Sequence, residues 1–477
     1  MNTSALQLLA SLLPLTPQKI YLVGGSVRDL LIKGQLCKDI DLVMPADSEI
    51  AAHAFAEKIG GSFFFLDEER KVSRVMKQGE GGVQQFDFTN FEGPDLNADL
   101  GRRDFTVNAM ALDLREFLTT PSFDSLIDLS QGREDVKNKL IRVTKPAVLD
   151  EDPLRLLRAV RFSATLGFTI EETTAGQIRL RAQFIAESSP ERIRDELFLI
   201  LSERNAERHL ALLDSLGLLA PLFPELEPLR GFAPGMYHVH DVLTHSIKTA
   251  GYIDGVLAEL RNLSPEHSAA VLSHLDENLE QGISRKAALR FACLIHDNAK
   301  PETFSNADGH VRFHGHDSLG AEKAVSLCRR FRLSRDTEKA VTRVIKQHMR
   351  LFNLSMPGGP SKNALYRYCR DMGDALPESL VLAQADARAT CEIMPKDKFT
   401  DTTKPMAAVL DYYYTKFLKV EARPLVTGED LIRAGLKPGP KFRELLEEIK
   451  EQQAGGVLKD RQEALVYLKS LMNSIRS

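Results

Sequence analysis

The chain has 477 residues, of which 43% are hydrophobic and 27% charged, and its formal net charge at pH 7 is -4. This length allows about three domains, and the small negative charge excludes nucleic-acid binding through an overall positive field, so any such binding must use local basic patches. The five cysteines form no CxxC pair, no apolar run is long enough to cross a bilayer and no basic leader precedes the first apolar stretch, a pattern typical of a cytoplasmic protein with reduced thiols.

A glycine turn between a strand and a helix is the first predicted feature that carries chemistry. The apolar run 20–23 predicts a strand that ends at Gly24 and Gly25, where the missing Cβ atoms let backbone N–H groups approach an anion closely. The helix predicted from Ser26 carries Arg28 and points its N-terminus at the same place, which favours a bound phosphate group.

Two aspartates follow on the next predicted strand. Asp39 and Asp41 flank Ile40, and because strand side chains alternate, both carboxylates should lie on one face while Ile40 and Leu42 point into the core. Two hard oxygen ligands beside a phosphate site suit Mg²⁺ and phosphoryl transfer. The alternative is a glycine turn followed by a half-exposed acidic strand, but the order of the pieces favours a nucleotidyl-transfer site.

The segment 1–130 mixes predicted strands with helices, which indicates an α/β or α+β head domain. Further strands are predicted at 63–66, 83–89 and 109–114, and Asp87 on the second of these is either another inward carboxylate or a solvated one. The segment 101–109 is either a turn held by salt bridges or a binding site for the triphosphate and ribose of a nucleotide. Its polar candidates are Arg102, Arg103, Asp104 and Asn108.

Strand signals vanish after about residue 131, and helix-period patterns predict a helical neck over 131–230. Asp150 is predicted to cap a helix that runs to Phe162, with Glu151 and Asp152 in its first turn. Capping explains these acids. It does not explain the basic stripe of the same helix, which consists of Arg155, Arg158 and Arg161.

The acidic and basic residues of this helix suggest a way to select a base. Asp152 lies one turn before Arg155, so a carboxylate acceptor and a guanidinium donor can project side by side. Cytosine and adenine present an amino donor beside a ring-nitrogen acceptor, whereas uracil and guanine present a carbonyl where the amino group would be. A carboxylate–arginine pair therefore accepts C and A and rejects U and G.

Most of the 12 histidines fall in the third predicted domain, 231–395, which is helical. Imidazoles and carboxylates together suit a divalent metal. The candidate ligands are His245, His296, Asp297 and Asp386. The structural alternative is a set of core histidines with satisfied hydrogen bonds, which we favour for His209.

The last predicted domain, 396–477, is a helical tail. Basic residues that could contact RNA phosphates, or form solvated charged faces, occur at 329–332 and 335 and, in the tail, at 437, 441 and 443.

Three motifs give the first half of the chain a resemblance to a known family. GGSVRD with DID, then RRDFTVNA, then EDPLRLLRAVRF resemble the signature of class II tRNA nucleotidyltransferases (CCA-adding enzymes) and the related bacterial poly(A) polymerases, within the DNA polymerase beta superfamily. The resemblance implies a polymerase-beta-like α+β head with a small mixed sheet, followed by an all-α neck, an all-α domain and a helical tail that helps to clamp tRNA. It also implies that Asp39 and Asp41 hold the catalytic Mg²⁺. The EDxxR motif would serve as a protein template for CTP or ATP.

The histidine-rich segment resembles the HD superfamily of metal-dependent phosphohydrolases. The resemblance implies a second divalent metal, of the transition series, on the four ligands above. Family members usually place a small aliphatic residue after the aspartate, where this chain has Asn298.

Together the resemblances imply an enzyme that adds C and/or A to tRNA 3′ ends and releases pyrophosphate, with tRNA, CTP and ATP as partners and no evident protein partner. The link 90–100 is short, whereas members that complete the CCA end have a longer basic loop here, so the chain is similar to members that add only two cytidines. The alternatives are a poly(A) polymerase and an HD-type phosphohydrolase whose head only binds nucleotides.

Overall fold

The computed structural model describes residues 3–69, 71–79, 82–233, 240–307, 310–355, 359–391 and 401–476. The chain forms two compact units: the first unit is Met1–Ser189 with Ser215–Leu222, and the second unit is Pro190–Asp214 with Phe223–Ser477. The finer division into four domains, with boundaries at 130, 230 and 395, stays a prediction. The last of these boundaries lies outside the described residues.

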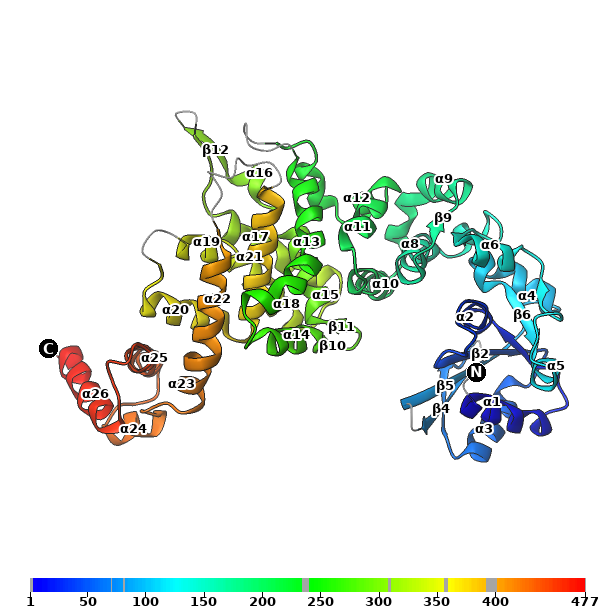
Figure 1. The fold of residues 1–477 in the computed structure, drawn as a ribbon, viewed down its shortest axis with the longest axis horizontal. Coiled ribbons are helices and arrows are strands. Elements are labelled where there is room, and N and C mark those ends of the chain that lie inside the picture. The colour runs from blue at the N-terminus through cyan, green and yellow to red at the C-terminus, as the bar shows by residue number, and fades with distance from the viewer. Residues whose placement is uncertain are drawn as a thin grey trace. The chain divides into compact units, whose positions relative to one another are not determined.

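A seven-stranded mixed sheet is the centre of the first unit (Figure 1, blue to cyan). Its strands are β1 (Tyr21–Val23), β2 (Asp39–Met44), β3 (Ser62–Asp67), β4 (Val72–Gly79), β5 (Gly82–Asn90), β6 (Met110–Asp113) and β7 (Ile127–Asp128). The order across the sheet is β3-β4-β5-β2-β1-β6-β7, and neighbours run antiparallel except β2 and β5, which are parallel. The predicted mixed sheet is confirmed, although the sequence patterns missed β4 and the short edge strand β7.

Alternation along β2 sorts its side chains between the two faces of the sheet. Ile40 and Leu42 are almost fully buried in the main core of the unit, beside Phe86 and Phe88 of the neighbouring strand β5. The helices α1 (Thr3–Leu12) and α3 (Ser48–Ile59) contribute to the same core. The aspartates of β2 therefore lie on the opposite face, as predicted.

Helices make up most of the rest of the first unit. They are α2 (Gly25–Lys33), α4 (Leu96–Arg102), α5 (Leu114–Thr119), α6 (Gly132–Asn138), α7 (Val148–Glu151), α8 (Leu154–Leu166), α9 (Glu172–Arg181) and α12 (Leu219–Leu222). A two-stranded parallel sheet, β8 (Leu140–Ile141) with β9 (Thr169–Ile170), corrects the expectation that strands are absent after residue 131.

The helix of the EDxxR motif does not begin where the sequence predicted. Asp152 has an extended backbone, since the following Pro153 disfavours the helical conformation before it, and α8 begins only at Leu154. Asp150 instead lies inside the short helix α7, and its carboxylate pairs with Arg181 at 2.6 Å. The prediction that Asp150 caps this helix is therefore wrong.

The second unit is helical, as predicted, with two additional short hairpins (Figure 1, green to red). Its helices are α10 (Pro190–Ser202), α11 (Ala206–Ser215), α13 (Val242–Leu263), α14 (Ser268–Asp276), α15 (Arg285–Ile295), α16 (Lys300–Thr303), α17 (His316–Arg330), α18 (Arg335–Gln347), α19 (Arg350–Leu354), α20 (Lys362–Met372), α21 (Leu376–Cys391), α22 (Thr403–Tyr412), α23 (Leu418–Ala422), α24 (Gly428–Arg433), α25 (Pro440–Gly455) and α26 (Arg461–Arg476). The hairpins pair β10 (Asn278–Glu280) with β11 (Ile283–Ser284) and β12 (Phe304–Ala307) with β13 (His310–Phe313). Helices α13, α15, α18 and α21 contact one another around a common centre.

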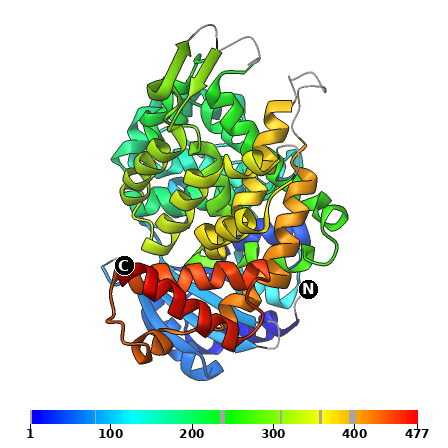
Figure 2. The same cartoon turned by 90° about the vertical axis from the view of Figure 1, so that its left-hand side faces the viewer.

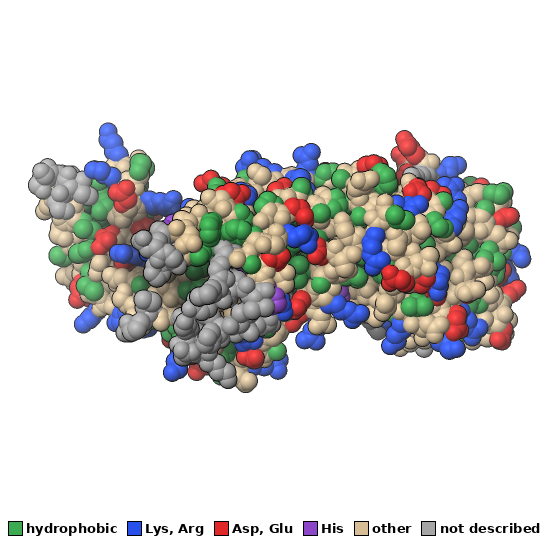
Figure 3. Space-filling view, turned by 90° about the horizontal axis from the view of Figure 1, so that it is seen from above, with side chains coloured by type: hydrophobic (Ala, Val, Ile, Leu, Met, Phe, Trp, Pro, Cys, Tyr) green, Lys and Arg blue, Asp and Glu red, His purple; other side chains and the backbone are tan. Residues whose placement is uncertain are grey.

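The end of the chain has a small core of its own. Helices α25 and α26 lie side by side (Figure 2, red), and their buried residues Leu445, Ile449 and Leu468 form a cluster with Leu431 of α24. Basic and acidic side chains alternate over the visible face of the molecule (Figure 3), in keeping with the small net charge. Among the described helices, none combines the length and apolarity needed to span a bilayer.

Gly132 is a fold position where no side chain fits, and it packs against the segment that leads to the site. An added Cβ would overlap the Thr106 carbonyl oxygen and lie 2.9 Å from Met110 Cγ. We expect Gly132→Ala to destabilise the protein by about 1–3 kcal/mol through overpacking. The control is Gly176→Ala, where a Cβ meets nothing within 4 Å inside α9, so that a gain of about 0.5–1 kcal/mol is expected. Urea unfolding midpoints measure both, and equal midpoints for the two variants would contradict the packing.

Candidate functional site

The glycine turn brings two charged side chains close together. Gly24 has the left-handed φ of 63°, and helix α2 begins at the next residue. A Cβ on Gly24 would lie 3.0 Å from Arg103 Nη1 and 3.1 Å from Asp41 Oδ2. The turn therefore needs glycine both for its backbone angle and for the close approach of these side chains.

Asp41 is a carboxylate whose charge is poorly compensated. Burial raises its pKa to about 6, with Asp87 and Asp39 adding to the rise and Arg103 and Arg28 opposing it. A cation at this face would relieve the repulsion among the three acids, so the donor set fits a divalent metal ion. Asp39 is exposed at the start of β2, on the same face.

Asp87, which the sequence offered as either an inward or a solvated carboxylate, is held by an arginine of the same sheet. Its Cα pairs with that of Asp41 across the parallel strands, but both its oxygens accept hydrogen bonds from Arg74 at 2.7 Å. Arg74 lies on β4, the strand that the sequence patterns missed, so its role could not be foreseen. The pair fixes Asp87 beside Asp41, and its role as a metal ligand stays a prediction.

The segment after α4 forms a closed network of hydrogen bonds instead of a set of free donors. Arg158 of α8 donates two hydrogen bonds to Asp104 Oδ2 at 2.8 and 2.9 Å, while Asp104 Oδ1 accepts from Asn108 at 3.1 Å and from the Phe105 N–H at 2.8 Å. Burial alone would raise the pKa of Asp104, but Arg158 and Asn108 hold it below its ordinary value. A sugar hydroxyl at Asp104 would have to displace one of these donors.

Arg28 reaches the same network, and Arg103 pairs with a neighbouring carboxylate. Arg28 donates to Asn108 Oδ1 at 2.7 Å, and it also pairs with Asp29. Arg103 donates to Asp99 at 3.0 and 3.1 Å. The structure thus brings together Gly24, Arg28, Asp41 and Arg103, as a triphosphate site requires. Arg102, by contrast, is exposed and forms a loose ion pair with Glu92 at 3.9 Å.

An aromatic ring anchors the basic stripe of α8. The guanidinium carbons of Arg28, Arg158 and Arg161 lie 5.5, 5.3 and 3.9 Å from the ring centre of Phe162. Cation–π contacts of this kind hold guanidinium groups at fixed positions although their charges repel. Phe162 was not predicted as a site residue.

The EDxxR motif is assembled differently from the side-by-side pair that the sequence suggested. Arg155 pairs with Glu151 at 3.6 Å and donates to the Val148 carbonyl oxygen at 3.1 Å. Asp152 accepts the Leu154 N–H at 3.2 Å. The three motif residues therefore lie around the start of α8, with Arg155 held by Glu151.

The four predicted ligands of the second unit meet in a buried cluster, which we call the HD cluster. His245 Nε2 lies 2.9 Å from Asp386 Oδ1, and His296 Nε2 lies 3.1 Å from Asp297 Oδ2. They come from α13, the end of α15 and α21. The ligand atoms of His245, His296 and Asp386 all lie within 4.8 Å of one another, and Asp297 belongs to a second such set with His296 and His348. Burial would raise the pKa of Asp297, but His296, Lys300 and His245 hold it well below its ordinary value.

The sequence patterns missed two histidines that complete this cluster. His316, the first residue of α17, and His348, just after α18, both point at Asp297, with Nε2 atoms 3.7 and 4.0 Å from its Oδ1. Burial lowers the pKa of His348 to about 4. Lys300 also contacts Asp297, with Nζ 2.6 Å from Oδ2. His314, near His316 in sequence, is exposed.

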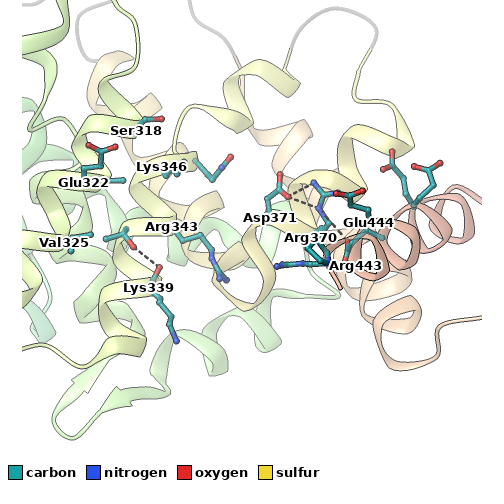
Figure 4. Close-up of a pocket in the computed structure, with 17 residues that line it drawn as sticks. Ser318, Glu322, Val325, Lys339, Arg343, Lys346, Arg370, Asp371, Arg443 and Glu444 are labelled. Carbon is teal, nitrogen blue, oxygen red and sulfur yellow. Dashed lines mark hydrogen bonds and ion pairs between the residues drawn. The ribbon is translucent and has the colours of Figure 1, made fainter. Parts of the chain in front are cut away.

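A groove of about 1180 Å³ between α17, α18, α20 and α25 has walls of mixed charge (Figure 4). Lys339, Arg343 and Lys346 line it on the α18 side. Arg443 and four glutamates line it on the α25 side, the latter being Glu444, Glu447, Glu448 and Glu451. The nearby basic run is largely neutralised, since Arg329, Arg330 and Arg332 pair with Glu338, Glu225 and Glu191. The predicted phosphate contacts at these positions stay predictions.

Comparison with known proteins gives a consistent result along the chain. Residues 20–142 match the Poly A polymerase head domain, residues 167–229 the RNA and SrmB-binding site of polymerase A, and residues 316–468 the tRNA nucleotidyltransferase domain 2. The fold is similar to that of the Bacillus stearothermophilus CCA-adding enzyme in complex with CTP, with a TM-score of 0.65 over 99% of this chain and 98% of that chain at 22% identity.

Two curated relatives align over almost the whole chain. The A-adding tRNA nucleotidyltransferase of Deinococcus radiodurans is 33% identical over 96% of this chain and 96% of its own length. The CC-adding tRNA nucleotidyltransferase of Thermus thermophilus is 31% identical over 95% of this chain and 94% of its own length. The chain therefore belongs to the tRNA nucleotidyltransferase family.

Proposed function

We propose that the first unit transfers nucleotides from CTP to the 3′ end of tRNA and stops after the second cytidine. The observation that supports a stop after the second cytidine is the short link between β5 and α4. Relatives that add A and relatives that add CC have similar identity to this chain, so identity does not separate the two products.

The link is held at both ends by hydrogen bonds. The Phe91 N–H donates to the Met44 carbonyl oxygen at 2.9 Å, and the Glu92 N–H donates to Asp99 Oδ1 at 3.0 Å. Asp95 then caps α4 by accepting the Ala98 N–H at 2.9 Å. A link of this length and constraint leaves no long mobile segment that could reshape the base pocket between C and A addition.

The site residues support an in-line transfer to the RNA hydroxyl. Asp39 and Asp41 would hold Mg²⁺, which when bound supplies a Lewis acid for the α-phosphate and the attacking oxygen. The Gly24–Gly25 turn and the N-terminus of α2 offer backbone N–H groups to the triphosphate, and Arg28 and Arg103 offer guanidinium forks. The RNA 3′-oxygen bonds to the α-phosphorus while the bond from the α-phosphorus to the bridging oxygen of the β-phosphate breaks. Pyrophosphate leaves, and the hydroxyl proton passes to water.

Base selection rests on the start of α8. Asp152 offers acceptor oxygens and Arg155 offers donors, and a carbonyl facing the carboxylate would leave two acceptors unpaired. The network of Arg158 with Asp104 holds α8 against the head, which fixes these groups relative to the triphosphate site.

The test is single-turnover addition of each labelled nucleotide to tRNA that ends before CCA, after one C and after CC. We expect CMP addition to the first two substrates and no AMP addition to the third. AMP addition to the CC end would overturn the proposed stop. Repeated addition of AMP to RNA unrelated to tRNA would support the poly(A) polymerase alternative instead.

The β2 aspartates should be essential to this transfer. We expect Asp41→Asn and Asp39→Asn to slow CMP addition on the order of 1000-fold, because metal-assisted charge stabilisation supplies several kcal/mol. Because the pKa of Asp41 is raised to about 6, protons should compete with Mg²⁺ as the pH falls from 7 to 5, and this weakening should disappear in Asp41→Asn. Calorimetric titration with Mg²⁺ in the presence of CTP, at pH values from 5 to 7, measures this change in Mg²⁺ affinity.

The matched control for the aspartate variants is Asp124→Asn, an exposed carboxylate of the same unit. It should retain the rate of the parent protein. Variants of Asp39 and Asp41 that kept a similar rate would contradict the assigned metal role.

The HD cluster favours a second function, metal-dependent hydrolysis of phosphate esters. A buried set of imidazoles and carboxylates within reach of one ion fits a divalent transition metal. In such a reaction water adds to phosphorus, the P–O ester bond breaks and the leaving oxygen takes up the proton. Lys300 supplies a positive charge at the cluster that a phosphate could use.

Removal of a cluster ligand should separate the two functions. We expect Asp386→Asn to abolish Mn²⁺-stimulated hydrolysis of 2′,3′-cyclic AMP and to leave CMP addition within about twofold, because the residue lies outside the transfer site. The control His314→Ala should leave both activities unchanged. Hydrolysis that persists in Asp386→Asn would argue against the cluster as its site.

The cytoplasmic location stays a prediction.

A further inference from the structure

We propose that a pocket of the second unit, which we call the arginine pocket, binds a free nucleotide through its polyphosphate group. The pocket has a volume of about 530 Å³ and lies between α13, α14, α15 and the end of α10 (Figure 1). The charged residues that line it are Arg204, Asp254, Arg261, Lys286 and Arg290. This inference requires neither of the activities proposed above.

The arginine pocket is separate from the HD cluster. His245 belongs to the first turn of α13 and Arg261 to its last turn. Asp254, the first residue of α13 that lines the pocket, comes nine residues after His245, which is about 13 Å along the helix axis. A ligand in the pocket therefore has its own set of contacts.

Positive charge converges on the pocket from three places in the chain. Arg204 comes from the segment between α10 and α11, and Arg261 comes from α13. Lys286 and Arg290 lie four residues apart, on one face of α15. Of the described residues that line the pocket, only Asp254 is acidic. Cations gathered in a concave site raise the local positive potential, which favours a ligand with several negative charges.

Arg290 forms a buried part of the pocket wall. Its side chain is fully buried, and it donates from Nη1 to the Leu201 carbonyl oxygen at 2.6 Å and from Nη2 to Asp254 Oδ1 at 2.5 Å. The other oxygen of Asp254 accepts the Asn205 N–H at 2.8 Å. Arg290 Nε has no hydrogen-bond partner within the described part of the chain. A buried donor without an acceptor costs free energy, and an anion in the pocket supplies the acceptor.

Two exposed arginines offer donors that the fold does not use. The side chains of Arg204 and Arg261 form no ion pair or hydrogen bond with other described residues, whereas Lys286 pairs with the exposed Asp276 at 2.6 Å. Glu259 of α13 pairs with Arg388 at 2.7 Å and so does not neutralise Arg261. Guanidinium groups bind phosphate oxygens in a bidentate manner, which makes both arginines suitable ligands for a polyphosphate group.

The rest of the wall fits the nucleoside part of such a ligand. Leu257 and Ala258 of α13 and Leu272 of α14 line the pocket with apolar surface, against which a base can pack. The volume lies in the range of about 300–1,000 Å³ that is typical of small-molecule sites. An RNA strand presents its phosphates in a row, whereas these cations converge on one pocket. The arrangement therefore favours a free nucleotide over an RNA backbone.

The experiment locates nucleotide binding by photolabelling of the full-length protein. The probe is 8-azido-ATP, and mass spectrometry identifies the labelled peptides. We expect saturable labelling of peptides from α13 or α14, next to Leu257 or Leu272, in addition to any labelling in the first unit. In Arg204→Ala with Arg261→Ala, half-maximal labelling of the α13 and α14 peptides should require about tenfold more probe or higher, because each lost guanidinium removes charge-assisted hydrogen bonds.

The matched control is Arg208→Ala with Arg423→Ala, which removes two exposed arginines that do not line the pocket. It should change the labelling at neither place. Labelling in the first unit tests the triphosphate site there, so the two sites succeed or fail separately. Absence of label from the second unit would overturn the arginine pocket, and so would labelling of α13 and α14 that is unchanged in the Arg204, Arg261 variant.

Two further measurements test the assignment without relying on that comparison. Inorganic tripolyphosphate should displace the probe from α13 and α14. Displacement by a short RNA at lower concentration than by tripolyphosphate would show that the pocket binds RNA phosphates, and would overturn the free nucleotide as its ligand. The Arg204, Arg261 variant should keep the urea unfolding midpoint of the parent protein. A lower midpoint would show that these arginines stabilise the fold and would contradict their assignment as ligands.

Discussion

The hydrogen-bonded ion pair between Arg158 and Asp104 holds the candidate transfer site together. One partner belongs to helix α8 and the other to the segment that follows α4, so the pair joins the EDxxR motif at the start of α8 to the segment that precedes β6 of the sheet. Asp104 is buried whereas Arg158 is partly exposed, and the cost of taking the carboxylate out of water offsets much of the stability that the pair contributes. Breaking it would leave Asp104 buried and unpaired, which makes the relative position of the two elements well defined.

The balance between burial and neighbouring charges also distinguishes the two clusters of acids. In the first unit, burial and neighbouring carboxylates raise the pKa of Asp41, so the site has an excess of negative charge for a cation to neutralise. In the HD cluster, Lys300 and the histidines already hold Asp297 ionised. A cation entering there must compete with an ammonium group 2.6 Å from the carboxylate, so the imidazole ligands must supply much of the binding free energy.

Sequence reasoning succeeded where a single element contains all the information. The alternation of Asp39 and Asp41 with buried Ile40 and Leu42 follows from strand geometry alone, and so does the glycine turn before α2. It failed where partners come from different elements. Arg74 forms an ion pair with Asp87 because the register of β4 against β5 places the two residues opposite each other. The histidines at 316 and 348 join the cluster only because α17 and α18 pack together. The start of α8 was misplaced because Pro153 acts on the backbone of the residue before it.

The parallel pairing of β2 with β5 also sets an order for folding. All other neighbours in the sheet are antiparallel, and the chain must pass through α3, β3 and β4 before β5 can lie beside β2. Contacts between residues far apart in sequence form late, because the entropy of closing the intervening loop opposes them. During synthesis on the ribosome, the acidic strand can therefore pair with β1 once residues up to Met44 have emerged, but its pairing with β5 must wait for residues up to Asn90.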